Sequence, residues 1–287
     1  KEETDTKESP PCMLLRSDGA SLYTTTDLAT IVERMKLFQP DEILYVVDKR
    51  QELHFIQVFR CARKTGLVEE DTRLSFLGFG TMNGKDGKPF KTREGGVMRL
   101  ENLIADIDEE MFTKIVENRS VRDKDARDTA KIVGLAAIKY GDLSNQATKD
   151  YIFDVDRFTS FEGNTGPYIL YTIVRIKSIL NRYVEAGGNL EAGEILPASN
   201  GSEKNLMLQL SGFGSMIESA FEEKAPHKIC AYIYEVSNAF NSFYHETKIL
   251  SEENQAQKES YIRLLQLTKR VLETSIDLLG FEAPDKM

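Results

Sequence analysis

The sequence contains few residues of the kinds that build disulfide frameworks and metal sites. It has no tryptophan, three cysteines and three histidines in 287 residues. The cysteines, Cys12, Cys61 and Cys230, are odd in number and widely spaced, which excludes a disulfide framework and a cysteine-based metal pattern. We therefore expect buried, reduced thiols and no metal held by the protein alone.

Long apolar runs are missing as well. No segment approaches the roughly 18 apolar residues that a membrane-spanning helix needs, and the opening KEETDTKESPP is too polar and acidic for a secretory signal. These features predict a cytoplasmic protein. Because the polar lead begins at Lys1 rather than at a methionine and continues directly into PCMLLRSDG, we expect residue 1 to be an artificial boundary inside a domain.

Positive charge is scarce overall, since 37 lysines and arginines stand against 46 acidic residues and the net charge is −9. This balance argues against a protein that holds nucleic acid by bulk electrostatics. The stretch from Lys85 to Arg99 differs, because it has five basic residues and two acidic ones. An acidic body with one basic loop suits a site for a small polyanion.

The first hundred residues alternate two kinds of pattern. Strands are expected at residues 12–16, 42–48 and 73–80, and helices at 27–38 and 51–65. The alternation predicts an α/β domain with a largely parallel sheet. Because these units make only half of a doubly wound sheet, we expect an N-terminal half to be missing.

From about Leu100 onward the pattern is helical, with no further strand expected. The segment EGNTGPY begins a helix that runs roughly 20 residues from Tyr168. Its apolar stripe consists of Ile169, Ile173, Ile176, Ile179 and Leu180. Two or three more helices complete a bundle. We thus expect an α/β part at residues 1–148 and an all-α part at 149–287.

Tyr23 and Asp27 lie four positions apart in SDGASLYTTTD. If a helix begins at Tyr23, both side chains share one of its faces. A carboxylate beside a phenol can bind a guanidinium, because it accepts two parallel N–H bonds while the ring offers a surface to a planar cation. The alternative is that Asp27 only caps a helix and Tyr23 is a half-buried strand residue.

Gln51 and His54 lie in VVDKRQELHF, where an expected strand ends and a helix begins. Open α/β sheets bind ligands beyond the carboxyl ends of their strands, and Gln51 can both donate to and accept from a polar ligand. The alternative is a solvated first helical turn in which neighbouring groups satisfy His54.

Asn-Gly and Asp-Gly turns in GFGTMNGKDGKPFKTREGG, residues 78–96, predict a hairpin loop after a strand. On such a loop, Lys88 and Lys91 can neutralise the charge that develops on phosphates during their transfer. An ordinary basic hairpin is the alternative.

Several motifs, in order and in register, make the chain similar to the arginyl-tRNA synthetases, class I enzymes with a Rossmann-type catalytic domain. They are SDGASLYTTTDLA, VVDKRQELHFIQVF, GKPFKTREGG, the segment KYGDLSNQATKDYIFDVDRFTSFEGNTGPYILYTIVRIKSIL and the ending LLGFEAPDKM. The resemblance covers nearly the whole chain after residue 10. It implies the C-terminal half of the Rossmann-type domain followed by a helical anticodon-binding domain.

The resemblance also implies roles for individual residues. Tyr23, Asp27 and Gln51 would bind the substrate arginine, and His54 would lie near ATP. The loop KPFKT stands where the family has its Lys-Met-Ser-Lys-Ser signature. It is a degenerate version of that signature.

Lys88 and Lys91 of this loop would therefore stabilise the triphosphate during adenylate formation. Two departures from the family pattern bear on activity. Thr26 replaces an arginine that usually precedes the aspartate, and no His-x-Gly-His motif is present. That motif belongs to the first half of the Rossmann-type fold, so it should precede residue 1. A chain without it is expected to bind adenine nucleotide poorly and to catalyse little alone.

Tyr168, Tyr171 and Arg175 follow one side of the long helix at spacings of three and four. Aromatic rings beside a basic residue suit stacking on an unpaired tRNA base together with a phosphate contact. The alternative is that the tyrosines belong to the core.

The complete protein is thus expected to be an arginine–tRNA ligase. It would form arginyl-adenylate from arginine and ATP, with Mg²⁺ accompanying the ATP, and transfer arginine to the 3′ end of its tRNA. We expect a monomer with no membrane partner. The alternatives are a non-catalytic tRNA-binding or arginine-binding paralogue and a class I synthetase for another amino acid.

Overall fold

The computed structural model describes residues 10–88, 99–117 and 123–287, and the chain divides into two compact units. The first unit comprises Lys1–Thr81 and Ala147–Asp150, and the second comprises Met82–Gln146 and Tyr151–Met287. Compactness alone does not define a domain, so the boundary between residues 148 and 149 remains a prediction.

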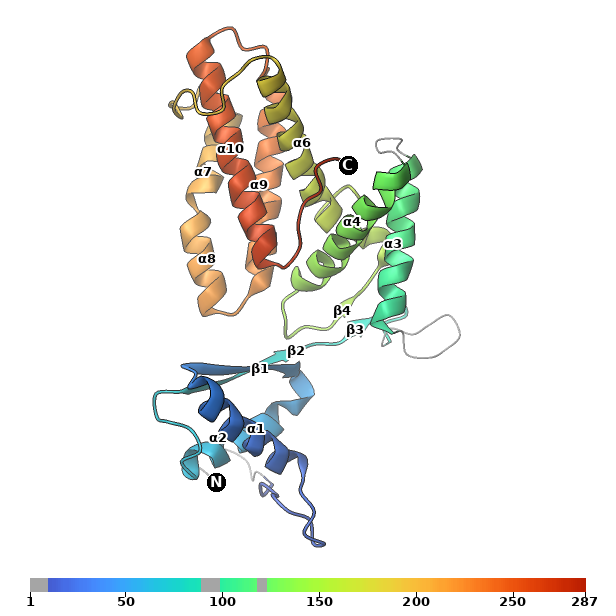
Figure 1. Ribbon diagram of the computed structural model, residues 1–287, viewed down its shortest axis with the longest axis vertical. Coiled ribbons are helices and arrows are strands. Elements are labelled where there is room, and N and C mark those ends of the chain that lie inside the picture. The colour runs from blue at the N-terminus through green and yellow to red at the C-terminus, as the bar shows by residue number, and fades with distance from the viewer. Residues whose placement is uncertain (1–9, 89–98, 118–122) are drawn as a thin grey trace. The chain divides into compact units, whose positions relative to one another are not determined.

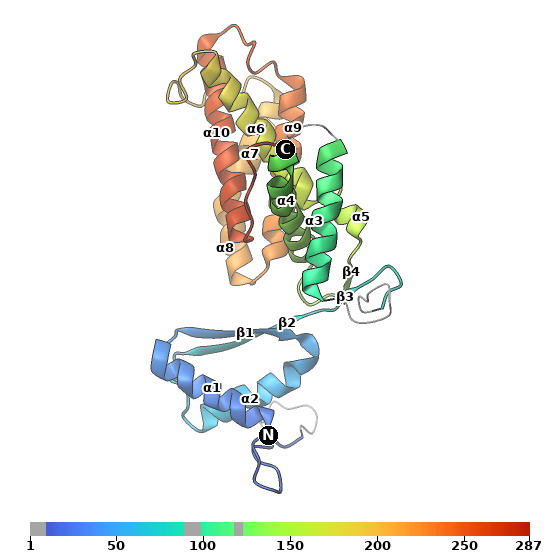
Figure 2. The ribbon, with the colours of Figure 1, turned by 45° about the vertical axis from the view of Figure 1, so that its right-hand side comes forward.

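The first unit is an α/β layer. Its elements are α1 (Tyr23–Phe38), β1 (Glu42–Asp48), the 3-10 turn η1 (Lys49–Gln51), α2 (Glu52–Lys64) and β2 (Arg73–Phe79). The two strands pair in parallel along their whole length. Both helices cover the same face of this sheet (Figures 1 and 2). Two of the three expected strands and both expected helices are confirmed, with α1 beginning at Tyr23 rather than at Asp27.

The sheet has one covered face and one open face. On the covered face, Ile43 and Tyr45 are 6% and 8% exposed and pack against side chains of the helices. On the other face, Leu44 and Val46 are 40% and 55% exposed. Parallel sheets normally have both faces covered. The described residues therefore supply the helical layer of one face only.

The strand expected at residues 12–16 is wrong. The segment has a single isolated bridge, between Leu15 and Ser21, and Leu15 is 55% exposed. The bridge closes a short turn in which the amide of Arg16 donates to the carbonyl of Ala20. So short a pairing cannot hold an apolar run as a strand.

The three cysteines are free thiols, but only Cys230 is buried as expected. Burial raises the pKa of the Cys230 thiol to about 12. The expectation of burial is wrong for Cys12 and Cys61, which are partly exposed. Cys12 precedes α1 and lies beside Cys61 of α2. Fewer elements surround a side chain there than in the helical unit.

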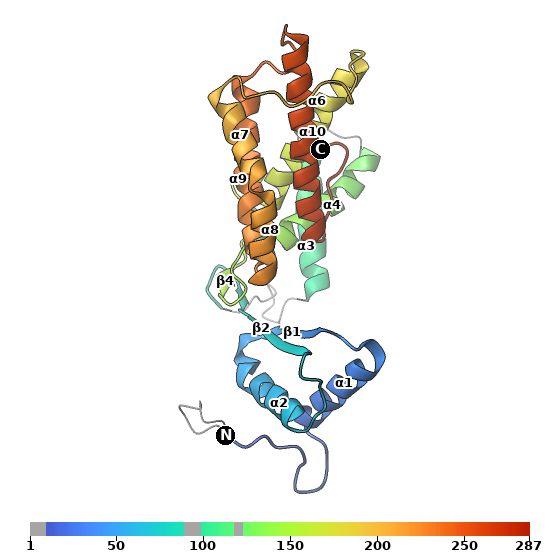
Figure 3. The same ribbon diagram turned by 90° about the vertical axis from the view of Figure 1, so that its left-hand side faces the viewer.

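The second unit is a helical assembly. Its elements are β3 (Met82–Asn83), α3 (Leu100–Glu117), α4 (Asp123–Leu143), β4 (Tyr151–Ile152), α5 (Val155–Phe158), α6 (Gly166–Glu185), α7 (Gly201–Ser211), α8 (Phe213–Glu222), α9 (Pro226–Glu246) and α10 (Gln255–Leu278). Helix α9 packs against α6, α7, α8 and α10, and α4 joins this bundle to α3 (Figures 1 and 3).

The long helix α6 begins as the sequence predicts. The Thr165 hydroxyl accepts a hydrogen bond from the amide of Tyr168, and Pro167 lies in the first turn. Gly166 allows close approach to α4, because a Cβ there would lie 2.4 Å from the carbonyl oxygen of Ala136. The expected apolar stripe is buried, which confirms α6 as a core helix.

Two expectations for this unit are wrong in detail. The two-residue strands β3 and β4 pair in parallel, although no strand was expected after Leu100. A pair so short has no periodicity to detect, and one flanking bond, from the Phe153 amide to the Asn83 carbonyl, extends it. Four helices follow α6 among the described residues, because a break at Gly212 divides the first of those expected.

Within the ranges that the structure describes, no helix combines the length and the apolar character needed to cross a membrane.

Candidate active site and nucleic-acid interface

Tyr23 and Asp27 occupy the first two turns of α1, as the guanidinium-binding interpretation requires. The N-cap of this helix is Leu22, so Asp27 is not the cap. Tyr23 is 85% exposed and helical, so it is not a half-buried strand residue. The alternative interpretation of this pair is therefore wrong, and the pair shares one exposed helix face.

Asp27 is anchored from the second helix. His54 on α2 lies with Nε2 2.6 Å from Oδ2 of Asp27, and the two side chains are 29% and 30% exposed. Because an ionised carboxylate only accepts hydrogen bonds, Nε2 of His54 carries the proton and donates. The contact fixes the carboxylate at the helix face while leaving part of it open to solvent.

The sequence singled out both residues but not their contact. They are 27 positions apart on different helices, and no periodicity connects them. The contact agrees with the alternative interpretation of His54, in which a neighbouring group satisfies the ring, and that group is the proposed ligand-binding carboxylate.

Gln51 ends η1 directly beyond the carboxyl end of β1, and its side chain is exposed. Asp48, the last residue of β1, caps this turn by accepting from the amide of Arg50. The Arg50 guanidinium also donates to both Asp48 oxygens, at 2.9 and 2.6 Å. These hydrogen bonds lower the pKa of the Asp48 carboxyl to about 2. Gln51 thus stands on a turn with a fixed, ionised cap.

A second anchor holds the same end of the sheet, and sequence reasoning missed it. Asp150 accepts from the amide of Thr81 at 2.8 Å and from Nζ of Lys49 at 2.9 Å. The backbone bond and then the lysine lower the pKa of the Asp150 carboxyl. Asp150 and Lys49 are about a hundred positions apart in the sequence, so no local motif reveals their contact.

Lys88 lies in a closed turn of the second unit. The amide of Gly84 donates to the Lys88 carbonyl at 2.8 Å, and the Lys88 amide donates to Asp86. Its side chain is exposed. Lys91 falls outside the described residues, so the rest of the expected hairpin remains a prediction.

One of the basic residues counted in this loop is already neutralised. Nζ of Lys85 lies 3.0 Å from an Asp154 oxygen and 2.8 Å from an Asp156 oxygen. The hydrogen bonds to these two carboxylates raise the pKa of the lysine. Lys85 therefore fastens the start of the turn, and Lys88 is left as the exposed cation of its described part.

On the bundle, Arg175 of α6 lies between two aromatic rings. Its Cζ atom is 4.8 Å from the ring centroid of Tyr171 and 5.0 Å from that of Tyr244 on α9. Its Nη1 donates to Oδ1 of Asn241 at 2.6 Å. Both rings are partly exposed, at 41% and 36%. The arrangement holds a guanidinium and two rings at the surface of the bundle.

Tyr168 belongs to the same network but is more enclosed. Its hydroxyl donates to Oδ1 of Asn238 and accepts from Nδ2 of Asn241, each at 2.8 Å. Burial raises the pKa of the phenol. Tyr168 packs against the core and supports the network, whereas Tyr171 presents its ring outward.

Comparison with known families assigns both parts of the chain. Residues 4–155 match the model of the tRNA synthetases class I (R), catalytic domain. Residues 169–287 match the DALR anticodon binding domain. The expected fold class, part of a class I catalytic domain followed by a helical anticodon-binding domain, is confirmed.

Two of the curated relatives are arginine–tRNA ligases. The arginine–tRNA ligase of Agathobacter rectalis is 67% identical over 295 residues, which cover 100% of this chain and 49% of that protein. The arginine–tRNA ligase of Alkaliphilus oremlandii is 58% identical over 285 residues, which cover 99% of this chain and 48% of that protein.

Solved structures agree. The arginyl-tRNA synthetase of Plasmodium falciparum has a TM-score of 0.82 and 25% identity, covering 99% of this chain and 48% of its own. The fold of the Thermus thermophilus arginyl-tRNA synthetase matches with a TM-score of 0.79 at 24% identity, over 96% of this chain and 50% of its own. The chain spans about half the length of the curated relatives it matches, and it belongs to the arginyl-tRNA synthetase family of class I.

Proposed function

We propose that this chain supplies the arginine pocket, the phosphate loop and the anticodon-binding helices of an arginine–tRNA ligase. In the first step, the carboxylate of arginine attacks the α-phosphate of ATP, which forms arginyl-adenylate and releases pyrophosphate. In the second, a ribose hydroxyl at the tRNA 3′ end takes the arginyl group and AMP leaves. The observation that carries the proposal is the 2.6 Å contact that holds the Asp27 carboxylate to His54, in a chain of this family.

Asp27 binds the guanidinium of the substrate, and His54 sets the orientation of the Asp27 carboxylate. The donor from His54 uses one lone pair of Oδ2. Oδ1 and the second lone pair of Oδ2 remain for two guanidinium N–H groups. Tyr23 stands one helical turn before Asp27, where its exposed ring meets the flat face of the cation. Gln51 offers a donor and an acceptor to the other polar groups of arginine.

Selection against lysine follows from the same geometry. A lysine ammonium is a compact point charge that cannot make two parallel N–H bonds to a carboxylate. Binding it would leave part of the Asp27 carboxylate desolvated and unpaired, which polar sites penalise by about 10⁴-fold or more in rate. Asp27 is thus both the anchor and the selector.

The phosphates of ATP are met by Lys88 and Lys91. Two cations on one loop neutralise charge that develops as pyrophosphate leaves. With Nε2 of His54 bonded to Asp27, Nδ1 is the ring atom left to face ATP. Mg²⁺ arrives bound to phosphate oxygens, which suits its preference for few protein ligands. Within the described ranges no cluster of His, Cys, Asp or Glu is suited to hold a metal.

The bundle receives the tRNA. An unpaired base stacks on the ring of Tyr171, and Arg175 provides a cation beside it. Tyr168 holds Asn241, which in turn holds Arg175. Because the net charge is −9, bulk electrostatics contribute little to holding the polyanion, and these few contacts become decisive. The enzyme is proposed to act as a cytoplasmic monomer.

The test is pyrophosphate exchange into ATP by the full-length protein, measured separately with each standard amino acid. The tRNA is present throughout, so that a requirement for it cannot mask activity. Arginine is expected to support exchange about 10⁴-fold better than lysine. Exchange driven by another amino acid would make the protein a different class I synthetase. No exchange at all, in a protein that still binds tRNA, would favour a non-catalytic paralogue.

A further inference from the structure

A basic pocket lies in the helical unit between α6 and the segment that joins α9 to α10. It has a volume of about 450 Å³. Its basic lining residues are Arg182 of α6, His245 at the end of α9, and Lys248, and Thr247 and Ser251 also line it. No Asp or Glu is among the residues that line it. We call it the α6–α9 pocket.

The cations of this pocket are free to meet a ligand. Arg182 and Lys248 are exposed and form no ion pair with a carboxylate among the described residues. In a chain of net charge −9, this pocket has basic residues and no carboxylate among the residues that line it. A cavity lined by such basic residues suits an anion with several oxygen acceptors.

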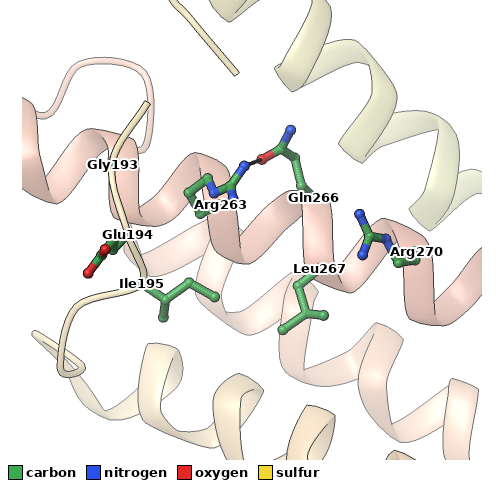
Figure 4. Close-up of a pocket in the computed structure, with 7 residues that line it drawn as sticks. All are labelled: Gly193, Glu194, Ile195, Arg263, Gln266, Leu267 and Arg270. Carbon is green, nitrogen blue, oxygen red and sulfur yellow. Dashed lines mark hydrogen bonds between the residues drawn. The ribbon is translucent and has the colours of Figure 1, made fainter. Parts of the chain in front are cut away.

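A second pocket of the same unit provides the contrast. It lies between α10 and the loop at residues 193–195 and contains Arg263 and Arg270 (Figure 4). Arg263 already donates to the carbonyl of Leu190 and to Gln266, and it lies 3.6 Å from a Glu191 oxygen. Glu194 adds a carboxylate to the lining. Its positive charge is therefore largely compensated, unlike that of the α6–α9 pocket.

The α6–α9 pocket continues the aromatic cluster described above. Tyr244 lines the pocket and also stacks with Arg175. Arg175 and Arg182 are seven residues apart on α6, which is close to two turns and roughly 10 Å along the axis. Their side chains therefore lie on the same face. One end of this face offers rings to a nucleobase, and the other offers cations to the backbone next to it.

We propose that the α6–α9 pocket binds a backbone phosphate of single-stranded RNA, adjacent to a base stacked at the Tyr171–Arg175–Tyr244 cluster. The proposal rests on the proposed function, because it gives the tRNA a second contact on the same helix. Arg182 and Lys248 pair with the non-bridging oxygens, and the Tyr244 ring marks the boundary between base and phosphate. A free phosphate would use the same donors, but it would gain nothing from the adjoining rings.

The experiment compares two double variants of the full-length protein with equal changes in charge. The pocket variant is Arg182→Gln with Lys248→Gln. The control is Arg270→Gln with Lys204→Gln, which removes two exposed cations elsewhere in the same unit. The affinity for tRNA is measured by fluorescence anisotropy at salt concentrations from about 50 to about 300 mM. Over this range the dependence of affinity on salt reports how many counterions the protein releases from the RNA.

The pocket variant is expected to bind tRNA about tenfold more weakly. Its plot of log affinity against log salt should be less steep by about 0.7, the value for one phosphate contact on a single strand. The control should keep the slope of the unmodified protein. The charge-conserving pair Arg182→Lys with Lys248→Arg should restore the slope, which excludes a folding defect as the cause.

Three outcomes would contradict the proposal that this pocket binds a backbone phosphate. An unchanged slope in the pocket variant is one, and an equal change in the control is another. The third is that inorganic phosphate alone, followed by ³¹P NMR, binds the pocket while the tRNA slope stays the same. These differ from failure of the proposed function, in which the unmodified protein would not bind tRNA. In that case Tyr171→Ala would also have no effect.

Discussion

The two compact units hold themselves together by different means. Among the residues that the structure describes, the buried hydrophobic core of the first unit consists of eight residues, and one face of its sheet is open. The corresponding core in the described part of the second unit has forty buried residues, contributed by all its long helices. The first unit therefore relies more on individual polar contacts, such as Asp27 with His54 and Asp150 with Lys49. The second relies more on packing.

This difference indicates how each unit performs its proposed task. Recognition of a small cation needs one carboxylate in a fixed orientation, and a single hydrogen bond between two helices provides it. Recognition of RNA needs rings and cations at fixed spacing over two helical turns, and a packed helix such as α6 provides that. Loss of a contact should thus impair substrate binding in the first unit, whereas loss of packing should impair stability in the second.

The largest effect on stability is expected in the bundle core. Phe240 is fully buried, so Phe240→Ala should lower the free energy of unfolding by about 3 to 5 kcal/mol. Phe221 is 80% exposed on α8, and Phe221→Ala should change it by less than about 0.5 kcal/mol. Urea denaturation followed by circular dichroism measures both. Similar losses for the two variants would contradict the description of the bundle.

A smaller effect, on substrate binding, is expected from the contact between the helices of the first unit. His54→Ala should raise KM for arginine and lower kcat/KM about 10- to 100-fold, because a hydrogen bond to a charged group contributes about 1.5 to 3 kcal/mol. His54→Gln, whose amide nitrogen can reach the position of Nε2, should recover part of the loss. Steady-state kinetics with arginine and ATP varied in turn provides the values.

A comparison of the changes in KM for arginine and in KM for ATP shows which substrate His54 serves. If His54 positions Asp27, KM for arginine rises more than KM for ATP. A change confined to the KM for ATP, with no recovery in His54→Gln, would show that the histidine serves the nucleotide alone.

The sequence predicted the features that depend on local patterns. Parallel strands at the right residues, the start of α6 with its proline, and the buried stripe of α6 all follow from periodicity and helix-start signals. Tyr23 and Asp27 were placed on one helix face from their spacing alone. The individual site residues came from these patterns together with the family resemblance.

Long-range contacts could not be predicted in the same way. Nothing in the spacing of Asp27 and His54, or of Lys49 and Asp150, indicates that they meet, because residues so far apart in sequence come together only in the folded chain. The 12–16 segment failed for the opposite reason, since an apolar run becomes a strand only when a neighbour pairs with it. The α6–α9 pocket likewise combines a helix with a loop about 65 positions away.

The most direct test of the account is arginine-dependent pyrophosphate exchange by Asp27→Ala in the full-length protein, with tRNA present. Glu33→Ala, which removes an exposed carboxylate from the same helix, is the matched control. We predict that Asp27→Ala loses about 10³-fold or more in kcat/KM for arginine while its affinity for tRNA stays within about twofold of the unmodified protein. Glu33→Ala should retain both properties. Exchange that survives in Asp27→Ala at the level of Glu33→Ala would contradict the assignment of this carboxylate to the guanidinium.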